Sequence, residues 1–130
     1  RSPIFFNVED VKKFWANSMQ FPHSHFANYY ISLEALSPNL VNERINYQDS
    51  QIKIDVNKLK DVNILVVTGD SDPRHPKEKD LAIVKFFKKN SINAKHYWLP
   101  DKGIFGNGHI MMIEKNNVKI AEIIYDWIKK

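Results

Sequence analysis

Cysteine is absent from this sequence of 130 residues. Disulfide bonds and thiolate metal sites are therefore excluded, and cysteine usage says nothing about the compartment. No apolar run approaches the ~18 residues that a membrane helix needs. The first residues, RSPIFF, resemble neither a secretion signal nor a transit peptide. Since they include no initiator methionine, we expect a chain that begins partway through a longer product, and the localisation stays open.

Charge of one sign is not concentrated anywhere. The net charge is +4, but lysines alternate with acidic residues in segments such as PKEKDLAIVKFFKKN, as on a solvated helix face. No basic run reaches five residues, so a phosphate-tracking stripe is disfavoured. We expect neither a nucleic-acid partner nor a membrane partner. The apolar fraction of 43% is that of one ordinary globular domain.

The second half of the sequence has a regular order of elements. Residues 63–70, NILVVTGD, form a continuous apolar run that is typical of a buried parallel strand. Apolar residues at helical spacing predict a helix near residues 77–90, and residues 94–99 have the pattern of a second strand. An amphipathic segment, NNVKIAEIIYDWIKK, predicts a closing helix with Asn117 as its N-cap. The order predicts two adjacent parallel strands with a helix crossing one face.

The first sixty residues are less regular. The segment NVEDVKKFWANSMQF predicts a helix, with Asn7 as its N-cap. The next segment, FANYYISLEALSPN, leaves two alternatives open: its tyrosines and Ile31 favour a strand, whereas Phe26, Tyr30 and Leu33 are spaced for a helix. The remaining residues up to 62 are polar and rich in asparagine, which indicates an irregular lead-in to the strand at residue 63.

Polar residues follow both predicted strands. Gly69 to Asp72 gives the pattern G-x-x-D after the first strand, and GNGH, ending at His109, follows the second. In this order, residues 63–130 resemble the C-terminal part of an α/β-hydrolase, a fold with parallel strands flanked by helices. The run GNGHIMMIEKNN further resembles a group of bacterial and fungal esterases with a G-N-x-H-M-M loop and paired asparagines. The resemblance implies a serine hydrolase that acts on a small carboxylic ester.

In that family, a histidine accepts the proton of a serine nucleophile, and a carboxylate fixes the tautomer of the histidine. The resemblance gives these roles to His109 and Asp72, while Asp70 is expected to bond local backbone N–H groups in an Asx turn. Some esterases of this group use a glutamate after the sixth strand instead. If the segment FANYYISLEALSPN is that strand, Glu34 is the alternative acid. We expect Nδ1 of His109 about 2.6–3.2 Å from an oxygen of Asp72, or of Glu34.

One part of such a hydrolase is missing. The sequence contains no G-x-S-x-G motif for the nucleophile elbow, and neither Ser18 nor Ser24 has a suitable context. We therefore expect residues 63–130 to be the C-terminal βαβα unit of a hydrolase core, and residues 1–62 to be a helical, cap-like or sixth-strand region. The chain alone should be inactive. Its incomplete sheet should pair with an N-terminal hydrolase segment or with a second copy at the exposed edge.

Two alternative functions stay open at this point. The chain could be a non-catalytic α/β interaction module derived from a hydrolase, or a small flavodoxin-like binding domain. Polar loops at both strand ends favour the hydrolase, and the carboxylates of GDSDP would repel a phosphate. No metal site and no cofactor are expected. Arg74 and His75, in the turn after Asp72, are expected to be solvated, and His96 to be an ordinary strand-face residue.

Overall fold

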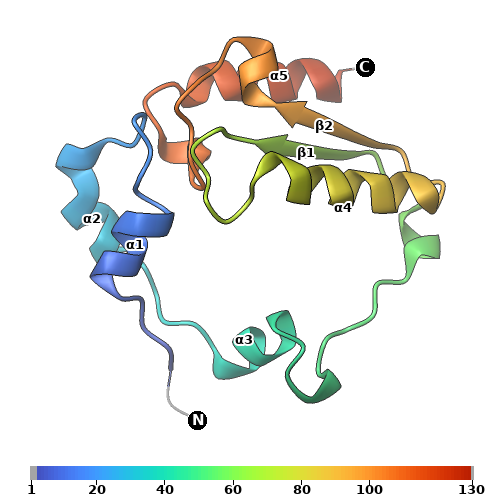
Figure 1. Cartoon of the computed structure of the whole chain (residues 1–130), viewed down its shortest axis with the longest axis horizontal. Coiled ribbons are helices and arrows are strands. Elements are labelled where there is room, and N and C mark those ends of the chain that lie inside the picture. The colour runs from blue at the N-terminus through green and yellow to red at the C-terminus, as the bar shows by residue number, and fades with distance from the viewer. Residues whose placement is uncertain (1–2, 130) are drawn as a thin grey trace.

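The computed structural model describes residues 3–129, and Figure 1 shows its elements in chain order. The helices and strands are α1 (Val8–Phe14), α2 (Phe26–Ile31), α3 (Pro38–Arg44), β1 (Ile64–Thr68), α4 (Lys77–Lys89), β2 (Ala94–Trp98) and α5 (Asn117–Ile128). Short 3₁₀ helices lie at His23–His25, Tyr47–Asp49, Val56–Leu59, Leu99–Lys102 and Met111–Ile113. Within the described range, no helix is both long and apolar enough to cross a membrane.

The two strands are adjacent and parallel, in a register that runs from Ile64 opposite Ala94 to Thr68 opposite Trp98. Helix α4 connects them and packs on one face of the pair, and α5 lies on the other face (Figure 1). The predicted order of strand, helix and strand is therefore confirmed. Side chains alternate between the faces: Thr68 bonds a residue of α4, while Val67 packs in the cluster that includes α5.

The main apolar cluster lies between the strands and α5. Its buried members are Leu99, Ile104 and Ile120. Burial of these side chains therefore holds α5 against the strands mainly through the N-terminal part of the helix, which follows the glycine-rich loop. Ile128, which the spacing predicts on the same buried face, is exposed at the far end of the helix. The best-anchored part of the closing helix is thus the part nearest His109.

The N-terminal part is helical. Asn7 caps α1, because its Oδ1 accepts the backbone N–H groups of Glu9 and Asp10 at 2.8 and 3.4 Å. This cap confirms the prediction, although the helix ends at Phe14 and is shorter than the predicted segment. Ser18 consequently lies outside the helix, where its side chain can bond another part of the fold.

In the ambiguous segment that follows, Phe26–Ile31 form the helix α2 and no strand forms up to residue 39, so the strand alternative is wrong. Within α2 the rings of Phe26 and Tyr30 stack at 6.1 Å, as residues four apart do on a helix. The hydroxyl of Tyr30 also donates to the carbonyl of Phe6 at 2.8 Å. The hydrogen bond to Phe6 and the ring contacts of Phe26 and Tyr29 with Phe21 thus outweigh the β preference of the tyrosines. Beyond α2 the chain runs through α3 and returns to β1 as a long arc (Figure 1).

A polar chain lies on the α4 side of the strands. The buried carboxylate of Asp80 accepts a hydrogen bond from Thr68 Oγ1 at 2.6 Å and one from His75 Nδ1 at 3.1 Å. Because the Thr68 hydroxyl is committed as a donor, its oxygen accepts the Nε2–H of His96 at 2.9 Å. Burial lowers the pKa of His96; Asp80 opposes this shift and Lys77 adds to it. His96 is therefore held as the neutral imidazole, a role that its strand-face pattern did not indicate.

This arrangement predicts a pH dependence of stability. The folded chain binds a proton at His96 less readily than the unfolded chain, since the pKa of His96 is lowered from its ordinary value of 6.5. The contribution of neutral His96 is fully present above that value, and it declines as the pH falls toward the folded pKa. We expect His96→Gln to flatten the fall in the free energy of unfolding below pH 6.5, measured by urea denaturation. An unchanged pH profile would contradict the assignment.

Candidate active site

His109 and Asp72 meet at the ends of the two strands. Nδ1 of His109 lies 2.8 Å from Oδ2 of Asp72, with side chains 28% and 6% exposed. A carboxylate accepts, so Nδ1 carries the proton and donates it. The distance lies in the range that the sequence analysis expects. The catalytic roles of the two residues remain predictions.

The other oxygen of Asp72 fixes the turn that follows it. Oδ1 accepts the backbone N–H groups of Arg74 at 2.8 Å and His75 at 3.2 Å, which is an Asx turn. Burial alone would raise the pKa of Asp72, but the bonds from His109 and the two N–H groups outweigh it, and the pKa lies below its ordinary value. The carboxylate is thus ionised at neutral pH and aimed at the imidazole.

Glu34 lies apart from this pair. It follows α2 in an exposed segment, and no sixth strand precedes it among the described residues. The structure therefore brings together His109 and Asp72 of the predicted site residues, and leaves Glu34 outside. The alternative depended on a strand that the aromatic packing of α2 replaces with a helix.

Two aromatic rings stack beside the His109 imidazole. His75 stacks on it with ring centroids 5.3 Å apart and planes at 28°, and Trp15 stacks at 6.4 Å and 22°. His75 also donates from Nδ1 to Asp80. The expectation that Arg74 and His75 are solvated is wrong, since both are half-buried. The positions of Trp15 and His75 beside His109 could not be predicted, because neither spacing nor composition separates these two residues from ordinary core and turn residues.

The site thus contains two stacked His–Asp pairs. The pair of His109 and Asp72 is the shorter, at 2.8 Å against 3.1 Å for His75 and Asp80. Asp72 is also fixed by backbone N–H groups on its second oxygen, whereas the second oxygen of Asp80 takes the Thr68 hydroxyl. No described group hydrogen-bonds Nε2 of His109, so its lone pair is available to accept a proton.

Asp70 ties the histidine loop to the end of β1. Its Oδ1 accepts the backbone N–H groups of Gly106 at 2.8 Å and Asn107 at 3.0 Å. The expected local Asx turn at Asp70 is therefore wrong, and Asp72 makes that turn instead. The cause is a tertiary contact. Two N–H groups of the loop after β2 lie beside the carboxylate of Asp70, which follows the end of β1, and they need an acceptor.

Glu114 holds the same loop from the other side. Its carboxylate is almost fully buried, at 1% exposure, and accepts the N–H of Gly108 at 2.8 Å and the side-chain amide of Asn107 at 2.5 Å. The hydroxyl of Ser18 also donates to Glu114. Glu114 thereby joins the N-terminal segment to the histidine loop. The sequence does not indicate this role, because a glutamate in a lysine- and asparagine-rich turn has the pattern of a solvated residue.

The asparagines of this turn are also fixed by the loop. Asn107 and Asn116 exchange amide hydrogen bonds at 2.7 and 2.9 Å. The N-cap of α5 is Asn116, with no side-chain cap bond, so the prediction of Asn117 as N-cap is wrong. The side chain of Asn117 donates to the carbonyl of Met112 at 2.9 Å. These amides lock the turn after His109 instead of capping the helix.

The loop can approach the strand end because residue 69 is glycine. A Cβ on Gly69 would lie 2.2 Å from the carbonyl oxygen of Asn107, closer than any side chain tolerates. The same oxygen accepts the N–H of Ser71 at 2.9 Å. Gly106 turns the loop with φ of +75°, in the left-handed region. The two loops therefore touch backbone to backbone, which sets the separation of His109 and Asp72.

Known proteins that resemble this chain are lipases and esterases by name. A probable secreted lipase phiG from Fungal sp. (strain ATCC 74256) is 36% identical over 72 residues, which are 55% of this chain and 19% of the lipase. A solved structure of a novel bacterial esterase, known at atomic resolution, aligns with 31% identity and a TM-score of 0.50, and covers 58% of this chain and 25% of the esterase chain. No family model matches.

These similarities support an α/β fold and a hydrolase family for the chain. The chain spans less than a third of the length of either relative. The activity of the complete relatives is therefore carried over to this chain only as a proposal.

The anchoring of the loop by Glu114 can be tested by substitution. Glu114→Ala leaves the N–H of Gly108 and the side chains of Asn107 and Ser18 without their acceptor, and each loss costs about 1–3 kcal/mol. We expect the free energy of unfolding to fall by about 3 kcal/mol or more, and amide exchange at Gly108 to accelerate. Glu122→Ala, on the exposed side of α5, should change neither quantity. Equal effects from the two variants would contradict the anchoring role.

Proposed function

We propose that this chain supplies the acid and the histidine of a serine hydrolase that cleaves carboxylic esters. His109 is the general base and acid, and Asp72 holds its ring. In this proposal, residues 63–130 are the C-terminal βαβα unit of the hydrolase core, and residues 1–62 form a helical, cap-like region.

The observation that supports this proposal best is the 2.8 Å hydrogen bond between Nδ1 of His109 and Asp72. A serine hydroxyl becomes a useful nucleophile when an imidazole nitrogen takes its proton. Asp72 fixes the tautomer with the proton on Nδ1, which leaves Nε2 as the acceptor. During attack the proton passes from serine to Nε2, and the carboxylate stabilises the resulting imidazolium. The proton then goes to the departing alcohol. Names of the similar proteins, lipase and esterase, agree with this chemistry.

The serine itself has no candidate among the described residues. Ser18 is buried and donates to Glu114, with no imidazole as its acceptor. In the proposal, a segment outside residues 3–129 delivers the nucleophile to Nε2 of His109. Loops at the carboxyl ends of parallel strands are where open α/β sheets place such sites.

The roles are tested in the natural gene product that contains this chain, with hydrolysis of p-nitrophenyl butyrate as the assay. His109→Ala removes the proton acceptor, and we expect kcat to fall by about 10³- to 10⁴-fold. Asp72→Asn leaves the tautomer unfixed, and a loss of about the same size is expected. In the 130-residue chain, the proton NMR signal of His109 Nδ1–H should lie far downfield and should move upfield in Asp72→Asn.

The second histidine provides the control. His75→Asn keeps a polar, hydrogen-bonding side chain beside His109 but cannot accept a proton, so we expect a loss of kcat of less than about tenfold. If His75→Asn loses as much as His109→Ala, the pair of His75 and Asp80 is the catalytic one. Full activity of His109→Ala would refute the proposal as a whole.

The proposal also concerns the free edge of β1. The strand is apolar along its length, yet Ile64 to Val67 are only half-buried, and β2 is its one partner among the described residues. Parallel strands are normally covered on both faces and paired on both edges. We propose that another hydrolase segment pairs with this edge, or a second copy of the chain when that segment is absent.

Sedimentation of the 130-residue chain tests the edge proposal. We expect concentration-dependent association at micromolar protein, with slower amide exchange for those N–H groups of β1 that point away from β2. Tyr125→Lys serves as the control, because Tyr125 is exposed on α5 and away from the strand edge. Loss of association in that variant, or a monomer at all concentrations, would contradict pairing at the edge.

A further inference from the structure

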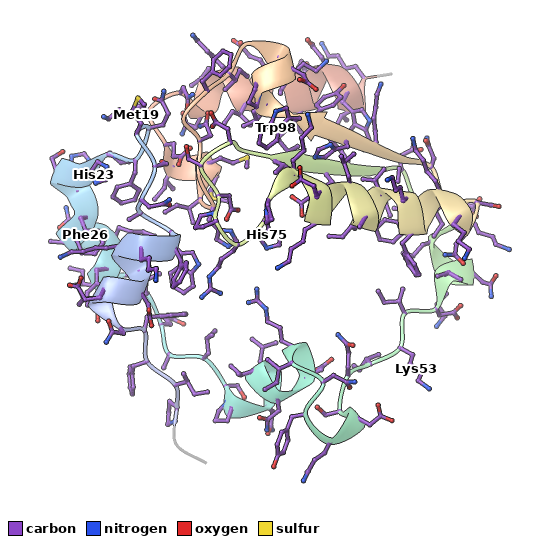
Figure 2. All side chains as sticks on the ribbon, viewed as in Figure 1. Met19, His23, Phe26, Lys53, His75 and Trp98 are labelled. Carbon is purple, nitrogen blue, oxygen red and sulfur yellow. The ribbon has the colours of Figure 1, made fainter. Side chains whose placement is uncertain are left out.

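A cavity opens next to the stacked histidines. Its volume is about 660 Å³, and it lies between the turn after Asp72, the start of α4 and the ends of α1 and α3. The side chains that matter for its chemistry are Phe14, Arg44, Arg74, His75, Lys79 and Asp80. Figure 2 shows His75 in the turn before α4, on the side of the molecule that faces α3. Since His75 both lines the cavity and stacks on His109, the cavity reaches the neighbourhood of the base.

The charges around this cavity are unequal. Three permanent cations, Arg44, Arg74 and Lys79, come from three separate parts of the chain. Within residues 3–129 none of them forms an ion pair with a carboxylate. The one carboxylate in the lining, Asp80, is already committed to Thr68 and His75. The first turn of α4 also begins here without a side-chain cap, but its acidic residues Glu78 and Asp80 offset the positive potential of the helix end, so the three cations carry the positive charge.

The side chain of Arg74 is already held in place before any ligand binds. Its guanidinium lies over the ring of Phe14 at 4.9 Å and the ring of Trp15 at 5.4 Å. Its Nε is buried and has no hydrogen-bond partner among the described residues. A stacked guanidinium loses little freedom on binding, and its planar donors match the two oxygens of a carboxylate. An unpaired buried donor is costly, so the position of this guanidinium is set by its contacts with the two rings and not by a carboxylate of the chain.

We propose that this cavity binds a carboxylate carried by the substrate, with Arg74 as the main partner and Arg44 and Lys79 as supporting charges. The inference rests on the proposed function and narrows it: the substrate is an anionic ester, such as the half-ester of a dicarboxylic acid. In this proposal the carboxylate lies at Arg74 and the ester group extends toward His75, the lining residue that stacks on His109.

Binding to the 130-residue chain tests this without any hydrolysis. The probes are monomethyl succinate, which is anionic, and dimethyl succinate, which has nearly the same shape but no charge. Titration is followed by NMR shifts of the Arg74 and His75 signals. We expect monomethyl succinate to bind at least about tenfold tighter than dimethyl succinate, and its affinity to fall as salt is raised from 50 to about 500 mM.

Variants locate the binding. Arg74→Gln should weaken the binding of monomethyl succinate by about tenfold or more and leave the affinity for dimethyl succinate unchanged. Lys79→Gln changes an exposed side chain and should not disturb folding. We expect it to lower the affinity for monomethyl succinate by a smaller factor. Lys85→Gln removes the same charge from α4 outside the cavity, and it should leave both affinities unchanged.

Equal affinities for the two probes would overturn the inference, as would equal effects of Lys79→Gln and Lys85→Gln. The outcome is separable from that of the proposed function. If the natural gene product hydrolyses no ester but this chain binds monomethyl succinate through Arg74, the anion site stands and the hydrolase assignment falls. If esters are hydrolysed with no preference for the anionic probe in binding, the anion site falls and the hydrolase assignment stands.

Discussion

The donors of one loop, and the carboxylates that satisfy them, determine the geometry of this molecule. Three consecutive backbone N–H groups, of Gly106, Asn107 and Gly108, donate to Asp70 and Glu114. The imidazole of the next residue donates to Asp72. Glu114 and the side chain of Asp72 are buried, whereas Asp70 is exposed. A buried carboxylate is costly unless it is hydrogen-bonded, and so is a buried N–H. The loop and the two buried carboxylates therefore need each other, and the position of His109 follows from this mutual requirement.

The same requirement links parts of the chain that have few apolar contacts. Glu114 accepts the hydroxyl of Ser18, and the N–H of Gln20 donates to the carbonyl of Gly106 at 3.2 Å. The segment after α1 is thereby fastened to the histidine loop, and Trp15 comes to lie on the imidazole. Hydrogen bonds to charged groups contribute about 1.5–3 kcal/mol each, which makes this small polar network comparable to a buried apolar side chain. These polar contacts add to the burial of Val11, Ala16 and Phe21 in holding the N-terminal segment at the site.

Features of this structure that depend on local sequence patterns can be predicted from the sequence, whereas features that depend on tertiary contacts cannot. Strand, helix and strand between residues 63 and 99 are predicted well, because the periodicity of apolar residues is a local signal that tertiary packing reinforces. The segment at residues 26–31 is ambiguous, because its aromatic residues satisfy both periodicities and their tertiary contacts with Phe21 and Phe6 decide. The contact of His109 and Asp72 can be predicted, since the two residues follow parallel strands whose carboxyl ends lie at the same edge of the sheet. Glu114 and Asp70 are not, because their partners are backbone N–H groups that no residue pattern marks.

The distribution of charge at the site has a consequence for the substrate. The carboxylates near His109 face inward and are satisfied by the loop, whereas the cations Arg44, Arg74 and Lys79 face the cavity beside it. An inward negative charge favours the imidazolium that forms when His109 takes a proton. An outward positive charge would destabilise that imidazolium unless an anion occupies the cavity. A substrate carboxylate at Arg74 would neutralise the opposing field at the moment when His109 becomes charged. The ligand that the cavity fits best is thus also the one that assists the proposed proton transfer.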